Sequence, residues 1–290
     1  MTRKFKPYLY ILILFISFIN INYTFSQGCN YPSNIGKKEI SDNYIIIKWA
    51  LNSNADHYKI EWRKINENYS STTTIDSIYT NEIKIIGLES GTQYYYKLKS
   101  ICSDEESNWS NEYSFITNFN NPTDCNLNFT LKDGNEYSGP GKTYFYINNY
   151  EFPESKLGIN VFIQNIKIII DHSWPHDLII NLTSPSGKKI QLFQTNQLQN
   201  NSIGNSTDTL CNESMNLSDE ACQNLSEEVD NYIGNFIPFE PITMLYDSTS
   251  PVGTWELEVI DQIDFNVGKL KFFEIDFEPI ICPMPQNISV

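Results

Sequence analysis

The sequence predicts an all-β protein built from two consecutive β-sandwich units behind a short apolar leader. Two observations lead to this prediction. Apolar and polar residues alternate with a period of two in most segments that could form regular structure, and turn-forming residues interrupt these segments at short intervals. About 264 residues (290 minus 26) follow the leader, which is enough for two domains of ordinary size.

Residues 1–26 have the layout of a signal peptide. Three basic residues precede an apolar run, and small polar residues follow it, so we expect cleavage after Ser26. A single membrane anchor is the alternative, because the apolar run is nearly long enough to span a bilayer. A lipid anchor on Cys29 is a third reading, although "FSQGC" lacks the usual leucine. We therefore predict a secreted or cell-surface protein with no stable membrane span after cleavage.

The net charge of -15 limits the classes of partner. Nucleic acid is excluded, because its phosphates require a basic face. Calcium is permitted, since it prefers clustered carboxylate oxygens. Acidic charge that simply keeps a secreted protein in solution is the simpler interpretation.

The first unit spans residues 27–120 and consists of short predicted strands separated by polar turns. Period-two alternation is clearest in "YIIIKWAL", "HYKIEWRKI" and "YYYKLKSIC". The residues expected to point inward are Ile45, Ile47, Trp49, Tyr58, Ile60, Trp62, Tyr94, Tyr96 and Leu98. Such a pattern indicates two sheets that share one core.

Four segments of this unit resemble a fibronectin type III domain in the right order, namely "NYIIIKWAL", "YKIEWR", "IIGLESGTQYYYKL" and "SNWSNEYSFIT". Trp49 matches the core tryptophan of that family. Leu88, Thr92 and Tyr94 match its L-x-x-x-T-x-Y pattern, in which the tyrosine hydroxyl caps a corner of the sandwich. The resemblance implies an immunoglobulin-like sandwich and says almost nothing about function, because the fold serves many tasks.

The polar segment "NFNNPTD" reads as a linker to the second unit, residues 121–280. There, "INVFIQNIKIIIDH" alternates and then becomes continuously apolar, as expected for a strand buried on both faces. "DLIINL" and "KIQLF" flank a predicted hairpin turn. In "TWELEVID" the glutamates are expected to face outward, and a change of phase in "GKLKFFEIDF" indicates a bulge. These strands predict a jelly-roll-like β-sandwich.

The second unit resembles the P domain, or P/Homo B domain, that follows the catalytic domain of subtilisin-like proprotein convertases. The motifs are "HSWPHDLIINLTSPSGKKIQLF", "NLSDEA", "SPVGTWELEVID" and "VGKLKFFEIDF". Phe273 stands where the family often has tryptophan, a change that packing should tolerate. The resemblance implies an association with serine-type endopeptidases and proteolysis, and family members often bind calcium.

Six cysteines follow the leader, in a chain expected to meet an oxidising compartment, so disulfides are expected. Sequence alone cannot choose among the pairings. Beside the first resemblance, Cys29 and Cys102 are candidates for one bond. Cys211 and Cys222, both in an insertion relative to the P-domain pattern, are candidates for a local loop.

The segment "DHSWPHD", residues 171–177, brings an aspartate, a serine and histidines together, but hydrolytic triads are assembled from separated segments. The structural interpretation is that Asp177 braces a turn while His172 closes the preceding strand. His172 and His176 would share a face only on a helix, which Pro175 opposes, so zinc is not expected. No G-x-S-x-G or H-E-x-x-H motif is present, and we predict no catalytic residue.

Calcium is the one cofactor that the sequence suggests. Asp177, Asp219 and Glu220 lie in predicted loops and offer hard oxygen ligands. Solvated loop carboxylates are the alternative interpretation.

The tail, residues 281–290, repeats the spacing C-x-x-P-x-N-I that opens the first unit. It is therefore interpreted as the start of a further fibronectin type III domain, with the partner of Cys282 outside this sequence. The alternative is that Cys282 pairs with Cys125 and ties the ends of the second unit together.

Two functional hypotheses follow. The first is a non-catalytic accessory region of a secreted multi-domain protein, whose P domain stabilises or positions a protease domain or a cell-surface partner. The second is an adhesion protein that binds a surface protein or glycan through exposed aromatic residues of the first domain.

Overall fold

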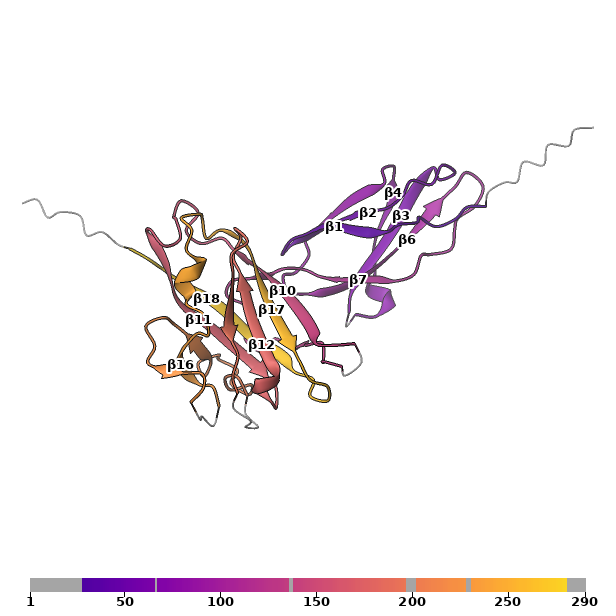
Figure 1. Cartoon of the computed structure of the whole chain (residues 1–290). Helices are drawn as coiled ribbons and strands as arrows, with labels where there is room; N and C mark the ends of the chain where they lie inside the picture. Colours follow the sequence, from indigo (N-terminus) through magenta and orange to yellow (C-terminus); the bar gives the residue numbers. More distant parts are fainter. Residues whose placement is uncertain (1–27, 66, 136–137, 197–201, 228–230, 281–290) are drawn as a thin grey trace, which may run out of the picture.

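The computed structural model describes residues 28–280 except 66, 136–137, 197–201 and 228–230, and these form two β-sandwiches in sequence (Figure 1). The predicted leader and the repeated motif at the tail lie outside the described residues. Within the described part, no helix is long and apolar enough to cross a membrane.

The first sandwich consists of a three-stranded and a four-stranded sheet. One sheet has the order β1 (Gly36–Ile40), β2 (Tyr44–Lys48) and β5 (Glu82–Ile86). The other has the order β4 (Thr73–Ile78), β3 (His57–Lys64), β6 (Gln93–Ile101) and β7 (Tyr113–Ile116), with the short 3-10 helix η1 (Tyr69–Ser71) after β3. Except for Trp62, which is half-buried, the residues predicted to face inward are buried.

The predicted tyrosine corner is confirmed. The hydroxyl oxygen of Tyr94 accepts a hydrogen bond from the backbone N–H of Glu89 at 2.9 Å, and Leu88 beside it is buried. The corner fixes the chain where it enters β6.

The second sandwich consists of a five-stranded and a six-stranded sheet. The first has the order β13 (Lys189–Phe193), β12 (Leu178–Thr183), β17 (Gly253–Asp261), β10 (Gly141–Asn149) and β8 (Phe119–Asn120). The second has the order β15 (Gln223–Asn224), β16 (Gly234–Ile237), β14 (Met215–Leu217), β11 (Val161–Asp171), β18 (Lys269–Pro279) and β9 (Phe129–Thr130). Two short 3-10 helices, η2 (Pro175–Asp177) and η3 (Ile242–Leu245), lie in the connections.

The long antiparallel pair of β11 and β18 confirms two sequence predictions. Ile168, Ile169 and Ile170 are all buried, because Phe272 and Cys211 cover the outward side of Ile169. The register shifts between Ile169 and Ile170, so one residue of β18 is unpaired, as the change of hydrophobic phase indicates.

The segment 118–124, predicted as a linker, also contributes a strand, β8, to the second sandwich. Phe119 is 3% exposed, pairs through β8 with β10, and packs edge-on against Phe129 and Phe145 at ring distances of 5.0 and 5.9 Å. Asn121 both donates to and accepts from the backbone of Ile275 at 2.8 Å. The segment is rich in polar residues because their side chains form hydrogen bonds with backbone groups at the edge of a sheet, and not because they are exposed to water.

The two sandwiches meet directly where β7 leads into β8 (Figure 1). The Asn118 side chain donates to Asn148 Oδ1 at 3.2 Å in a buried bond, and the Asn118 N–H donates to the carbonyl of Ser41 at 3.0 Å. Tyr150 donates its hydroxyl to Asp42 Oδ1 at 3.1 Å. Residues from both domains therefore form one hydrogen-bonded joint.

Candidate functional site

The segment 171–177 connects β11 to β12, and its first histidine is fully engaged. His172 is 3% exposed, its Nε2 lies 3.1 Å from Asp261 Oδ2, and its Nδ1 accepts the N–H of Trp174 at 3.1 Å. An Nδ1 that accepts a hydrogen bond carries no proton, so Nε2–H donates to Asp261. Both ring nitrogens are occupied, and His172 cannot serve as the base for a serine nucleophile. It fastens the end of β11 to the end of β17.

Asp177 braces the other side of the same turn. Its carbonyl accepts the N–H of Gln262 at 2.9 Å, and its Oδ1 lies 3.0 Å from His176 Nε2. Burial raises the pKa of the Asp177 carboxyl, and the nearby histidines oppose that rise. These contacts agree with the structural interpretation of the segment.

The structure does not bring the three expected calcium ligands together. Asp219 accepts the backbone N–H groups of Ile242 and Thr243 at 2.8 and 3.0 Å, at the start of η3. Asp219 and Glu220 line one cavity with the first residues of β11, whereas Asp177 lies beyond the last residue of that strand.

At about 3.3 Å per residue, the two ends of β11 are roughly 30 Å apart. Asp177 is therefore too far from Asp219 and Glu220 for the three carboxylates to bind the same calcium ion. Over the residues that the structure describes, no group of three or more His, Cys, Asp or Glu side chains is arranged to hold a metal.

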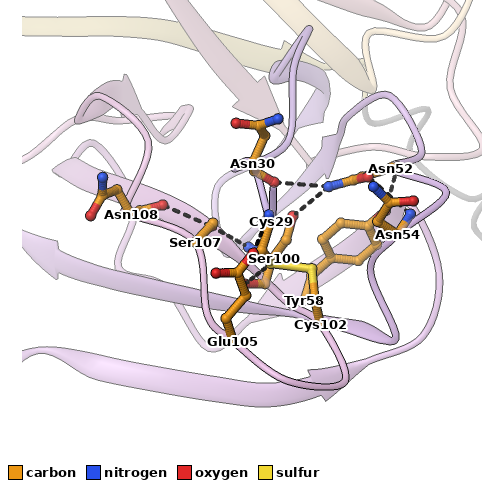
Figure 2. Close-up of a disulfide and its surroundings, with 10 residues drawn as sticks. All are labelled: Cys29, Asn30, Asn52, Asn54, Tyr58, Ser100, Cys102, Glu105, Ser107 and Asn108. Atoms are coloured by element: carbon orange, nitrogen blue, oxygen red, sulfur yellow. Dashed lines mark hydrogen bonds between the residues drawn. A yellow bond between two sulfur atoms is a disulfide. The ribbon is translucent and has the colours of Figure 1, made fainter. Parts of the chain in front are cut away.

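The Cys29–Cys102 pairing is confirmed. Their Cα atoms lie 6.0 Å apart, and the bond fastens the segment before β1 to the residue after β6. Figure 2 shows the polar contacts around it: Glu105 accepts the N–H of Cys29 at 2.7 Å, and Asn52 donates to the carbonyl of Asn30 at 2.9 Å. The entry of the chain into the first domain is thus fixed covalently and by hydrogen bonds.

The Cys211–Cys222 pairing is wrong in this structure, where Cys211 bonds to Cys125 and Cys222 is exposed. The residues around Cys125 run alongside β18, which places its sulfur atom over the outward face of Ile169, next to Cys211. The same bond removes Cys125 as the partner of Cys282, which lies outside the described residues.

Sequence reasoning missed a buried carboxylate on the outer face of the first sheet of the second domain. Glu258 was expected to face solvent, yet it is 3% exposed. Lys189 and Asn181 donate to its Oε2, and Lys142 lies 3.8 Å from Oε1. Burial alone would raise the pKa of Glu258, but hydrogen bonds from Lys189, Asn181 and Tyr144 outweigh burial and lower it to about 2. The alternation of apolar and polar residues correctly places Glu258 on the outer face of the sheet. It cannot show that the long side chains of Lys189 and Lys142 cover this carboxylate.

This network should make the stability of the second domain depend on pH. The folded pKa of Glu258 lies below the ordinary value of 4.5, so its contribution is present above about pH 4.5 and is lost as pH falls toward about 2. The difference between 4.5 and about 2 corresponds to roughly 3 kcal/mol. Urea unfolding at about pH 6 and about pH 3 should show a smaller loss in Glu258→Gln than in the unchanged chain. Equal losses in both proteins would contradict the assignment.

Several aromatic residues on the outer face of the first domain, though not the exposed Tyr31 and Tyr79, contact cations of the same chain. Lys97 and Lys99 lie 4.8 and 4.9 Å from the ring centre of Trp109, and Arg63 lies 4.5 Å from that of Tyr69. Each such contact stabilises by about 0.5–1 kcal/mol at an exposed site. The rings of Trp109 and Tyr69 therefore already contact cations of the same chain, and this argues against their use as a binding surface for another protein or a glycan.

Comparison with known proteins agrees with the two sandwiches. A family model for the fibronectin type III domain matches residues 30–116, and one for the proprotein convertase P-domain matches residues 164–277. Among curated proteins, none matches the chain. Both matches fall in the predicted order along the sequence.

Several solved structures are similar to the chain. The FN1–FN3 domains of chicken CNTN1 are 18% identical, and the match covers 30% of this chain and 30% of that chain with a TM-score of 0.28. The fn3 domain of human collagen alpha-1(XX) chain is 16% identical over 33% of this chain and 91% of its own, with a TM-score of 0.29. An Fn3-like protein from Clostridium thermocellum is 22% identical, and the match covers 30% of this chain and 90% of that chain with a TM-score of 0.26.

Proposed function

The chain contains a fibronectin type III domain followed by a proprotein convertase P-domain, and from this premise we propose that it is the accessory region of a secreted subtilisin-like serine endopeptidase. In this proposal the P-domain stabilises or positions a separate peptidase domain. The observation that supports it most directly is the P-domain match over residues 164–277. The two disulfides are consistent with secretion, because such bonds persist in oxidising compartments.

The joint between the domains supports a positioning role. Direct bonds from Asn118 and Tyr150 link the two sandwiches, and Phe119 is anchored in the core of the second. A partner held by the second domain would therefore keep a fixed orientation to the first. The occupied ring nitrogens of His172 support assigning the chemistry to another domain.

The proposal is tested by deleting the coding segment for residues 121–280 in the producing cell. Secreted serine endopeptidases, labelled with a fluorophosphonate probe, should lose activity faster on heating when this segment is absent. An unchanged half-life would contradict the stabilising role. Casein cleavage by the purified chain itself, blocked by a serine-directed inhibitor, would contradict the non-catalytic assignment.

A second function is favoured by one surface of the P-domain. Tyr144 and Tyr146 are 43% and 45% exposed on the outer face of β10, and Glu256 and Thr183 lie beside Tyr146 across the sheet. Aromatic rings among hydrogen-bonding groups suit a protein or glycan ligand.

If the chain is an adhesion protein, it should bind to a glycan or surface-protein array, and Tyr146→Ala should abolish this binding. An array to which the unchanged chain does not bind would contradict adhesion.

A further inference from the structure

A cavity of about 750 Å³ lies at the end of the second sandwich where β11 begins and β18 ends. We call it the acidic groove. The lining residues used in this argument are Phe162, Asp219, Glu220, Asn235, Tyr246 and Glu278. It lies at the opposite end of β11 from the segment 171–177, so it is separate from the site described above.

The charge of the acidic groove is negative and largely uncompensated. Among the described residues, its lining holds three carboxylates and no lysine, arginine or histidine. Asp219 already accepts two backbone N–H groups. The exposed carboxylates of Glu220 and Glu278, by contrast, have no hydrogen-bond or ion-pair partner among the described residues.

The negative charge continues along the outer face of β18. Glu274 and Asp276 alternate with Glu278 on this strand. On the neighbouring strand β11, Lys167 places its Nζ 2.8 Å from Glu274 and 3.6 Å from Asp276. A second cation, Lys188, donates to the backbone carbonyl of Tyr246 at 2.8 Å and has no contact with Glu220 or Glu278 among the described residues. Because Lys167 is shared by these two carboxylates, it leaves the charge at the groove end of the strand unneutralised.

Aromatic side chains form one wall of the groove. Phe162 and Tyr246 are half-buried and meet edge to face at a ring distance of 5.6 Å. The Tyr246 hydroxyl accepts the N–H of Ile163 at 3.1 Å, which holds the ring in place. Asn235 adds an amide that can donate and accept hydrogen bonds.

We propose that the acidic groove binds a short arginine-bearing segment of a partner polypeptide. A guanidinium group pairs with carboxylates in a bidentate geometry and also stacks on aromatic rings, and both features occur together here. A neutral ligand could not form an ion pair with the carboxylates of Glu220 and Glu278. A metal ion is disfavoured, because no group of three or more candidate ligands is arranged for one in the described part of the chain. The inference stands apart from the peptidase proposal, since it requires no protease domain.

The test measures fluorescence anisotropy of a labelled peptide of alternating arginine and serine, titrated with the purified chain. A peptide with citrulline in place of arginine has the same shape without the charge. We expect binding of the arginine peptide only, weakened by added salt. Glu220→Gln and Glu278→Gln should each weaken it by about tenfold, the loss expected for one charge-assisted contact.

The matched control is Asp104→Asn, which removes one exposed carboxylate charge from the first domain. It should bind like the unchanged chain. Melting curves should show that Glu220→Gln and Glu278→Gln remain folded, because both residues are exposed. The proposal is overturned if the arginine peptide does not bind, if the citrulline peptide binds equally well, or if all three variants bind alike.

Discussion

Replacing Phe119 with alanine is expected to lower the free energy of unfolding of the P-domain by about 3–5 kcal/mol, the range for a fully buried phenylalanine. Phe119 is 3% exposed and belongs to the core of the second sandwich, although it lies only three residues after the last residue of β7. Its ring packs against Phe129 and Phe145. The substitution would leave a cavity at the point where the two domains meet.

Calorimetry and hydrogen exchange can assign this effect to a domain. The transition of the P-domain should move to lower temperature, and amides of β10 should exchange faster, because β8 pairs with that strand. Phe119→Leu keeps most of the apolar volume and should cost less than about 1.5 kcal/mol. An unchanged P-domain transition in Phe119→Ala would show that the segment is only a spacer.

Gly91→Ala probes the same joint from the first domain. Gly91 has a positive φ of 56°, and a Cβ there would lie 2.5 Å from the Phe119 ring. The substitution removes no apolar surface, so it should loosen the joint while leaving most of the P-domain core intact. Faster exchange of β8 amides without a large loss of P-domain stability is the expected result.

The parts of this fold that could be predicted from the sequence depend on local periodicity. Trp49, Tyr94 and the bulge in β18 follow from patterns within one strand or corner, and the structure confirms each of them. Such patterns show which face of a strand a side chain occupies. They do not show what covers that face.

Local patterns do not suffice where a distant segment decides the environment. Phe119 is buried because its strand, β8, pairs with the edge of β10. Glu258 is buried because Asn181 on the adjacent strand β12 and Lys189 on β13, one strand further away, both contact its carboxylate. The partner of Cys211 lies 86 residues earlier in the chain. Polar composition, alternation and short cysteine spacing contain no information about these long-range pairings.

Removing the Cys29–Cys102 disulfide is expected to lower the free energy of unfolding of the fibronectin type III domain by about 4 kcal/mol. The bond closes a loop with a sequence separation of 73 residues, and the loss of loop entropy in the unfolded chain gives a value of this size. In the folded state the bond also holds Cys29 where Glu105 accepts its N–H. Without the bond, the segment before β1 would depend on this contact and on Asn52 (Figure 2).

The measurement compares denaturant unfolding of Cys29→Ser/Cys102→Ser with that of the unchanged chain. Hydrogen exchange of the β6 amides follows the first domain alone. Cys222→Ser is the matched control, because Cys222 is exposed and unpaired in the described structure. A reductant should destabilise the unchanged chain to the level of the double variant. The same reductant should not change the denaturant midpoint of the first domain in the double variant. Among the described cysteines, that variant keeps only the Cys125–Cys211 bond, which belongs to the second domain. If the double variant and the unchanged chain unfold at the same denaturant concentration, the first domain does not depend on this bond, and its entry segment is held by hydrogen bonds and packing alone.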